Sequence, residues 1–420
     1  MVVANQPEGE AVTVSAYDLD LPTVATSSTG VIPPEDVEAL GDQWLARTRF
    51  GFAMTHYEDF FEIKRDRRFH KAIELVQSSE VDLGDSETLK DPGKSLLQLE
   101  GDEHTRLRRL VAPSFTPAAA TRYREFMRLV LNDLVDDVSA SGRCELVADV
   151  CDQYPVAVIC ELVGAPREDW RLFSRWALDI NRRFDNNLER DLPIINQANQ
   201  ELFAYLEEMI DRRRSQPADD LLSHLIAAEE EGDRLSTAEM LTMVKLVLLG
   251  GSDTTRNQLG LSVAVFAEHP EQWALLRENP ELAAQAAEEC LRYLGTIRGI
   301  TVLASEDVEY RDTLFPKGTI ISLSVTGANK DPGVWEEPTS FDITKPRENR
   351  QVIFGSGIHT CLGAPLARAE LQEALVVLAT RMPDLEFDGP PTWMPTSVAI
   401  WGPESLPVKF RPGVPRTDLA

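Results

Sequence analysis

The segment Phe354-Gly-Ser-Gly-Ile-His-Thr-Cys-Leu-Gly363 restricts the local fold of this chain more than any other feature of its sequence. Its glycines at positions 355 and 357 permit positive φ angles and together predict a tight turn. The apolar spacing from Leu362 to Thr380 then predicts a helix, because Pro365 is tolerated in a first helical turn. Cys361 is therefore expected at a helix N-terminus, where unpaired N–H groups and the helix dipole lower a thiol pKa.

A cysteine in this position has several chemical roles open to it. A thiolate ligates soft or borderline metals, and Gly363 leaves room for a planar macrocycle to lie against the chain. Cys361 as a nucleophile with His359 as its base is an alternative, although neighbouring loop positions do not by themselves make a catalytic triad. Gly355-x-Gly357 also begins like a dinucleotide fingerprint, but Thr360 stands where the third glycine belongs. A buried structural cysteine is a fourth interpretation.

A second feature is a long predicted helix with glycines in its middle. Ser236-Thr-Ala-Glu239 is a capping-box signature, and the apolar helical pattern runs from there to His269, where Pro270 stops it. Its middle contains Gly250-Gly251-Ser-Asp-Thr254-Thr255, and two adjacent glycines cost about 1 kcal/mol each relative to alanine. They indicate the close approach of a flat ligand or of another backbone. A packing notch against a second helix is the other interpretation, and Thr254 can bond back to a carbonyl and open the helix.

Residues 354–363 resemble the haem-binding loop of cytochromes P450, Phe-Gly-x-Gly-x-His-x-Cys-x-Gly, at every fixed position. Gly250-Gly251-x-Asp253-Thr254-Thr255 is similar to the oxygen-activation helix of that family. Glu289-x-x-Arg292 resembles its Glu-x-x-Arg helix, and His104-x-x-x-Arg108 resembles its propionate-binding helix. The last two patterns are weak alone, because charged pairs at these spacings are common on helix surfaces. All four occur in the family's order, and the chain resembles the soluble bacterial class.

This resemblance implies a cofactor and its main ligands. The chain is expected to bind haem b, iron protoporphyrin IX, with the Cys361 thiolate as the axial metal ligand, whose electron donation favours cleavage of the O–O bond. His104, Arg108 and His359 are expected to bind the haem propionates, since buried carboxylates need charged or strongly hydrogen-bonding partners. A solvated helix face is the alternative for the first two.

The resemblance also assigns residues on the rest of the site. Phe354, Gly250 and Gly363 are expected to contribute to haem binding. Thr254 is expected to position oxygen and water, and Asp253 to relay protons from solvent, so both are candidate catalytic residues.

Two positions depart from the family pattern. The arginine that usually contacts a propionate, five residues before the aspartate of the Glu-Asp-Val turn, is Val302 here. Arg298, four residues before Val302, is the candidate substitute for haem binding. A substrate carboxylate is its alternative partner. The arginine expected to complete the Glu-x-x-Arg network is replaced by Lys345, whose ammonium cannot form the same bidentate contact. The sequence leaves Lys345 and the nearby Arg347 both open for that role.

The resemblance further implies a substrate pocket lined mainly by apolar side chains, which favours a hydrophobic or aromatic substrate. Its candidate lining residues are Leu246, Val247, Ile297, Ile400 and Trp401. The sequence contains no flavin or nicotinamide fingerprint, so electrons are expected from a separate ferredoxin and its NAD(P)H-dependent reductase. Residues 104–128 carry six arginines and one acid. Within them a basic patch for an acidic ferredoxin, or an ordinary helix surface, would include Arg106, Arg109, Arg122 and Arg124.

Composition excludes several other functional classes. The formal net charge of −27 repels phosphate backbones and anionic lipid, so neither a nucleic acid nor a membrane is an expected partner. No stretch approaches 18 uninterrupted apolar residues, and the first residues lack a basic segment followed by an apolar one. We therefore expect a cytoplasmic protein. Five cysteines without a Cys-x-x-Cys pair indicate neither a disulfide framework nor a zinc site.

The pattern of apolar residues predicts a mainly α fold with a small β part. From about residue 36 to 290 the apolar period is mostly helical, whereas strand-like segments are short and lie near residues 302–325. The family resemblance implies a helical prism around a buried haem. Residues 1–30 are polar and are expected to form a flexible N-terminal arm, and residues 31–420 a single haem domain.

The expected activity is that of a haem-thiolate monooxygenase, which hydroxylates or epoxidises a small organic substrate with O2. Two alternatives remain, namely peroxide-driven or oxidative-coupling chemistry on the same haem, and a non-catalytic haem-thiolate protein that only binds ligands. The adjacent Asp253 and Thr254 favour an enzyme, since a ligand-binding protein does not need proton delivery.

Overall fold

Helices make up most of the chain in the computed structural model, which describes residues 13–27, 31–71, 94–182, 188–230, 235–396 and 400–413. This confirms the predicted fold class. The helices are α1 (Pro34–Leu40), α2 (Tyr57–Arg65), α4 (Gly101–Val111), α5 (Pro117–Arg122), α6 (Arg124–Ser139), α7 (Tyr154–Val163), α8 (Trp170–Asn181), α9 (Leu188–Ser215), α10 (Leu221–Glu230), α11 (Thr237–Glu268), α12 (Pro270–Glu278), α13 (Ala283–Tyr293), α14 (Val325–Asn329) and α15 (Ala364–Arg381).

The strands are short and form small sheets. They are β1 (Val14–Ser15), β2 (Leu45–Arg47), β3 (Gly51–Met54), β4 (Phe69–Lys71), β5 (Arg143–Glu145), β6 (Gly299–Ala304), β7 (Val308–Tyr310), β8 (Thr313–Phe315), β9 (Ile320–Ser324), β10 (Glu386–Phe387), β11 (Thr392–Trp393), β12 (Pro403–Ser405) and β13 (Pro407–Lys409). The largest sheet has the order β2-β3-β9-β6-β4, in which β3 and β9 are parallel and the other pairs are antiparallel.

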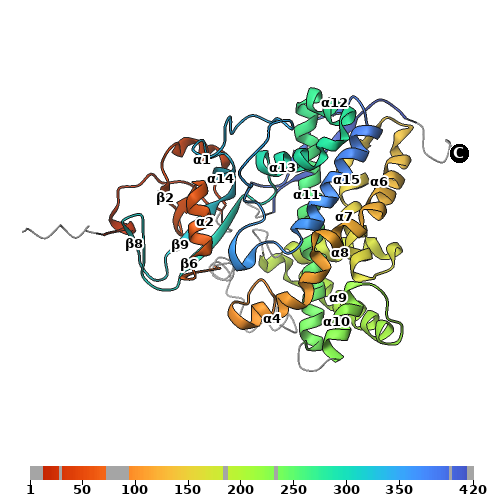
Figure 1. Ribbon diagram of the computed structural model, residues 1–420, viewed down its shortest axis with the longest axis horizontal. Helices are drawn as coiled ribbons and strands as arrows, with labels where there is room; N and C mark the ends of the chain where they lie inside the picture. The colour runs from red at the N-terminus through yellow and green to blue at the C-terminus, as the bar shows by residue number, and fades with distance from the viewer. Residues whose placement is uncertain are drawn as a thin grey trace, which may run out of the picture.

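The molecule has a β-rich side and a helical side. In Figure 1 the largest sheet lies at the left with α1, α2 and α14, whereas α11 and α15 run through the helical side at the right. One contiguous hydrophobic core includes residues of both sides, such as Phe52 of β3, Leu259 of α11 and Leu375 of α15. The functional candidates on α11 and on the loop before α15 therefore belong to one packed body.

The long helix α11 matches its prediction closely. Ser236 is its N-cap, and the reciprocal hydrogen bonds between Ser236 and Glu239 form the predicted capping box. The helix ends at Glu268, and Pro270 begins α12. Most of its residues are buried because α7, α8, α13 and α15 all pack around it. A helix that is apolar on all sides is expected in the centre of a large domain.

The short β elements agree with the sequence in part. The segments predicted near 308–310 and 319–325 are β7 and β9, and the turn at Pro316-Lys317-Gly318 joins β8 to β9. Part of the segment predicted as an N-terminal arm is packed instead, since β1 pairs in parallel with β8 and Ala16 is fully buried. Residues 1–12 and 28–30 of that arm lie outside the described residues. Within the part of the chain that is described, no helix has both the length and the apolar character to cross a bilayer.

Candidate functional site

The loop before α15 folds as the two glycines predict. Gly355 and Gly357 have φ angles of 70° and 74°, and the Cys361 N–H donates to the Phe354 carbonyl at 2.8 Å. A Cβ at Gly357 would lie 2.5 Å from the Lys64 carbonyl oxygen at the end of α2, so this position has no room for a side chain. The loop is thereby closed on itself and held against α2, and it delivers Cys361 directly before α15.

Cys361 differs from the other cysteines in its accessibility. Its side chain is exposed, whereas Cys151, Cys160 and Cys290 are buried and Cys144 is partly buried. Protein atoms around the thiol nevertheless desolvate it in part, and this desolvation raises the pKa of Cys361 above its ordinary value.

The predicted lowering of this pKa is wrong for the chain alone. The Gly363 and Ala364 N–H groups and the positive charges of Arg108 and Arg368 do lower the Cys361 pKa, but desolvation outweighs them. No group of three potential metal-ligating side chains occurs among the described residues. A metal bound to Cys361 would therefore have to bring its other ligands with it, as the iron of a porphyrin does.

A group of five basic side chains, here called the basic cluster, lies beside the cysteine loop. It consists of Lys64, Lys71, His104, Arg108 and His359, whose charges act on one another. The rings of His104 and His359 are 4.9 Å apart, and both Nε2 atoms are buried without a hydrogen-bond partner among the described residues. Arg108 also donates to the Thr360 carbonyl at 2.7 Å, which ties α4 to the loop.

The pKa values in the basic cluster show that the described residues compensate its positive charge only in part, with Glu100 as an acid that acts on it. Burial, with the nearby charges of Lys71 and His104, lowers the pKa of His359 to about 3. Burial, followed by the charge of Lys64, lowers the pKa of Lys71 to about 8. Groups that are destabilised in this way are suited to an anionic ligand. The cluster therefore fits the propionates of a haem, and it adds Lys64 and Lys71, which no sequence motif indicated.

The two adjacent glycines of α11 differ in what surrounds them. A Cβ at Gly251 would lie 2.3 Å from Cδ1 of Ile159 on α7, so this glycine is the predicted packing notch. Gly250 is exposed, and no described atom outside its own helix lies within 4 Å of the place of its Cβ. The Thr254 hydroxyl donates to the Gly250 carbonyl at 2.7 Å, as predicted. The packing notch is thus confirmed for Gly251, whereas the approach of a flat ligand at Gly250 remains a prediction.

Asp253 has a partner that the sequence did not reveal. The Asn181 side-chain amide at the end of α8 donates a hydrogen bond to the Asp253 carboxylate, and both residues are partly buried. The contact joins residues 72 positions apart, and no local pattern marks Asn181. The amide restricts the orientation of the carboxylate without neutralising its charge.

The Glu-x-x-Arg pair is buried and completed by Arg347. Glu289 and Arg292 are 1% and 2% exposed, and two hydrogen bonds of 2.8 Å join them. Arg347 donates to Glu289 at 2.7 and 3.1 Å, whereas Lys345 pairs with Glu337 at the surface. Of the two candidates that the sequence left open, Arg347 and not Lys345 therefore completes the Glu289–Arg292 network.

The cytochrome P450 family model matches residues 69–382, which is most of the chain. The chain belongs to the cytochrome P450 family. Membership implies a haem-thiolate cofactor and monooxygenase activity. The exposed Cys361 and the unpartnered nitrogens of His104 and His359 fit that cofactor.

Two relatives that are named for an activity are each 35% identical to this chain. Luteothin monooxygenase of Streptomyces thioluteus is 35% identical over 383 residues, covering 90% of this chain and 92% of the relative. Mycinamicin IV hydroxylase/epoxidase of Micromonospora griseorubida is 35% identical over 361 residues, covering 84% and 88%. The crystal structure of CalO2 superimposes with a TM-score of 0.84 at 28% identity, covering 90% of this chain and 96% of that one.

Arg298 stands apart from the basic cluster of this cytochrome P450. It is 4% exposed, directly precedes β6, and donates a hydrogen bond to the Thr396 carbonyl. Its guanidinium lies over the Trp401 ring, 4.9 Å from the centroid. At the position where the family pattern has an arginine, Val302 is buried in the core. The haem-binding role predicted for Arg298 remains a prediction.

Some of the expected pocket residues do meet. Ile297 and Ile400 form an antiparallel bridge, and Trp401 stacks on Trp393 with ring centroids 5.2 Å apart. On α11, Val247 is buried and Leu246 is partly buried. These contacts bring the segment before β6 next to the segment before β12, as the predicted pocket requires.

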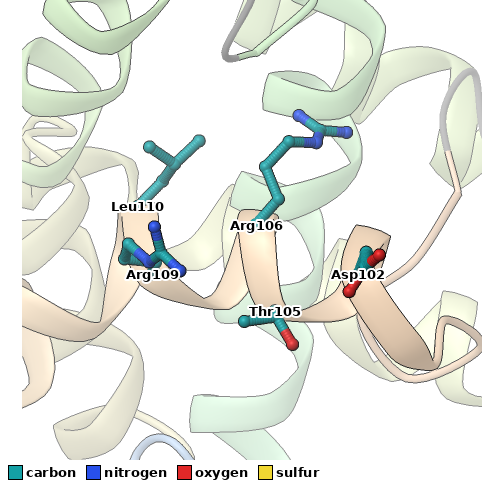
Figure 2. Close-up of a pocket in the computed structure, with 5 residues that line it drawn as sticks. All are labelled: Asp102, Thr105, Arg106, Arg109 and Leu110. Carbon is teal, nitrogen blue, oxygen red and sulfur yellow. The ribbon is translucent and has the colours of Figure 1, made fainter.

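The surface of α4 carries less free positive charge than the sequence suggested. A cavity of about 390 Å³ on this surface is lined by Asp102, Thr105, Arg106, Arg109 and Leu110. In Figure 2, Arg106 extends from α4 toward a neighbouring helix, and its ion pair is with Glu239.

The other predicted patch arginines are also mostly paired. Arg122 contacts Asp219 at 3.2 Å and Arg124 contacts Glu373 at 2.8 Å, whereas Arg109 is exposed. Three of the four predicted patch arginines are thus in ion pairs, and their role in binding a ferredoxin remains a prediction.

Proposed function

We propose that this cytochrome P450 hydroxylates or epoxidises a small, mainly hydrophobic organic substrate, with electrons from a separate ferredoxin and reductase. The observation that carries the proposal is the joint presence of three features. They are an exposed thiol at Cys361, the basic cluster with its unpartnered histidine nitrogens, and the open face of α11 at Gly250. A haem with two propionates needs a thiolate ligand, a binding site for anions and open space beside a helix.

The chain's own residues would hold the cofactor in place. Cys361 would ligate the iron, and the basic cluster would bind the propionates through charge-assisted hydrogen bonds. When bound, haem b supplies the activation of O2, with the thiolate's electron donation favouring O–O cleavage. The closed loop from Phe354 to Cys361 fixes the sulfur, since its backbone hydrogen bond and the contact of Gly357 with α2 limit its movement.

Thr254 and Asp253 would deliver protons for the reaction. The Thr254 hydroxyl donates to the Gly250 carbonyl, so its oxygen lone pairs are free to accept a hydrogen bond from a water. Asp253 lies one residue earlier, and Asn181 holds its carboxylate. A carboxylate between solvent and a hydroxyl-bound water can pass protons to a reacting oxygen.

Hydroxylation or epoxidation is the reaction type that the relatives' names support, since one relative is a monooxygenase and the other a hydroxylase/epoxidase. The apolar side chains of Ile297, Ile400 and Trp401 support a mainly hydrophobic substrate. Peroxide-driven chemistry and ligand binding without turnover are the alternatives, and the Asp253–Thr254 pair favours neither of them.

The haem-thiolate site is tested by the spectrum of the reduced protein with carbon monoxide. The parent protein is expected to show the long-wavelength Soret band of thiolate ligation, and Cys361→Ala to lose it. Cys290→Ala is the matched control, because Cys290 is buried on α13 and is expected to leave the band unchanged. A parent spectrum without this band, or a band that survives in Cys361→Ala, contradicts the proposal.

The monooxygenase reaction is tested by Thr254→Ala. Product formed per O2 consumed is expected to fall about tenfold or more, while O2 consumption and peroxide release continue. Thr255→Ser is the control, since Thr255 is buried on another side of α11. If product formation driven by added peroxide is the faster reaction and is insensitive to Thr254→Ala, the peroxide-driven alternative replaces the proposal.

A further inference from the structure

Two buried arginines of this chain differ in how their charge is compensated. Arg292 is 2% exposed, and all three of its guanidinium nitrogens donate hydrogen bonds within the chain. Its acceptors are the Glu289 carboxylate and the carbonyl oxygens of Asn329, Pro338 and Ser340. Arg298 is 4% exposed, yet within the described residues it makes one hydrogen bond, from Nη2 to the Thr396 carbonyl.

Among the residues that the structure describes, the Arg298 guanidinium therefore lacks an anionic partner. Its Nε is buried and has no acceptor among the described residues. The acid whose charge raises the Arg298 pKa is Glu35, which is exposed on α1 and forms no ion pair with Arg298. Burial lowers the Arg298 pKa to about 10, so the charge persists at neutral pH although the site disfavours it. The Trp401 ring face compensates only part of the cost of burying such a charge.

The position of Arg298 separates it from the expected propionate site. None of the five basic-cluster residues is among the charges that act on Arg298, whereas those residues act on one another. Along an extended strand, Arg298 lies about 13 Å from position 302, where the family pattern has its arginine. Arg298 and the basic cluster are thus two separate places at which a bound anion would compensate buried positive charge.

Strand geometry also indicates what Arg298 faces. Alternate residues of a strand share a face, so Arg298 lies on the same side as Ile300. Ile300 approaches the cysteine loop, since a Cβ at Gly355 would lie 3.8 Å from its Cδ1. Ile297 bridges Ile400 beside the Trp401 ring. The guanidinium is therefore set beside the Trp401 ring, on the face of the strand from which Ile300 reaches the cysteine loop.

We propose that Arg298 binds a carboxylate carried by the substrate, so that this enzyme acts on organic acids with an apolar body. The inference rests on the proposed function and assigns its substrate class. Nε and the second N–H of Nη2 form the side edge of the guanidinium, which matches the two oxygens of a carboxylate. Ile300, on the same face as Arg298, and Trp401, under its guanidinium, provide apolar contacts for the rest of such a molecule. A carboxylate in this place compensates the buried charge that the chain leaves unpaired.

The test compares carboxylic acids with their methyl esters as ligands of the haem-loaded protein. Straight-chain and aryl carboxylic acids, each paired with its ester, are titrated, and the Soret shift gives the dissociation constants. At least one acid is expected to bind about ten- to a hundredfold more tightly than its ester. Arg298→Gln is expected to remove this preference, and Arg298→Lys, which keeps the charge without the fork, to retain part of it.

Arg109→Gln is the matched control, because Arg109 is exposed on α4 and is expected to leave the preference unchanged. The inference is overturned if no acid is preferred over its ester, which includes the case that none binds, or if the preference survives in Arg298→Gln. If Arg298→Gln does not fold, Arg298→Lys decides, and an unchanged preference in that variant overturns the inference.

Haem content and the reduced carbon monoxide spectrum are measured on every preparation. Arg298→Gln is expected to keep both, because the inference places Arg298 on the substrate. Loss of haem in this variant alone would show that Arg298 holds a propionate and would overturn the inference. A parent protein without the thiolate band instead contradicts the proposed function, so the two failures are distinguishable.

Discussion

Replacing Arg347 by methionine is expected to destabilise the protein far more than the same change at Lys345. Both are cations in the segment after β9, and the sequence offered either as the third member of the Glu289–Arg292 network. Arg347 makes two hydrogen bonds to Glu289 and one of 2.8 Å to the Glu336 carbonyl. Lys345 pairs with carboxylates that are mostly exposed.

The magnitude follows from burial. The Glu289 side chain is 1% exposed and that of Arg347 is 11% exposed. Removing one partner from a buried ion pair costs about 3–5 kcal/mol. We expect the lower end, about 3 kcal/mol, because Glu289 keeps both of its hydrogen bonds to Arg292. For a chain of 420 residues this corresponds to a fall in Tm of about 3 °C. Exposed pairs such as those of Lys345 contribute little, so Lys345→Met is expected to leave Tm within error.

Calorimetry of the haem-loaded protein at one scan rate measures the difference, and the urea midpoint of Soret loss provides a second measure. Both variants are methionines, so the lost apolar stem is matched. Equal shifts in the two variants, or a larger shift for Lys345→Met, would refute the assignment of the buried role to Arg347. A further variant, Arg347→Lys, is expected to recover only part of the loss, since lysine cannot form both contacts to Glu289.

Three further predictions concern the haem site. In the haem-free protein, a thiol reagent should modify Cys361 first, and added haem should protect it; fast labelling of a buried cysteine would contradict this. Burial, with the charges of Lys71 and His104, lowers the His359 pKa to about 3, so the unfolded chain binds the extra proton first. The free energy of unfolding of the haem-free protein should therefore fall as pH drops from about 6.5 toward 3. In His359→Gln this fall should be shallower, and an unchanged slope would show that His359 is not its cause. Asp253→Asn should lower coupled turnover about a hundredfold and raise the solvent isotope effect, and Asn181→Ala should do so severalfold; unaltered isotope effects would exclude a proton-relay role.

The sequence predicted best those features that depend on local backbone chemistry. The capping box at Ser236, the stop at Pro270 and the positive φ angles of Gly355 and Gly357 all occur as expected. Each depends on residues within a few positions of one another. The bond from Thr254 to the Gly250 carbonyl was predictable for the same reason, because a hydroxyl in a helix reaches the carbonyl four residues earlier.

Features that depend on distant residues were beyond the sequence. Asn181 forms a hydrogen bond with Asp253, which is 72 positions away in the sequence. The charge of Lys71 lowers the pKa of His359 over a still longer sequence separation. The net effect on the Cys361 pKa was predicted with the wrong sign, because the helix N-terminus is a local feature whereas desolvation arises from the surrounding fold. The ion pairs of the patch arginines were likewise beyond the sequence, since the acids that pair with Arg106 and Arg124 come from α11 and α15.

Buried polar groups without partners carry much of the functional information in this structure. The Arg292 guanidinium is compensated entirely within the chain, and its role is accordingly structural. The Nε2 atoms of His104 and His359 and the Nε of Arg298 are buried and uncompensated among the described residues. Since a folded protein loses stability for each such group, a ligand that supplied the missing acceptors would offset that loss. In our proposals these two separate sets of donors bind two separate anions, one on the cofactor and one on the substrate.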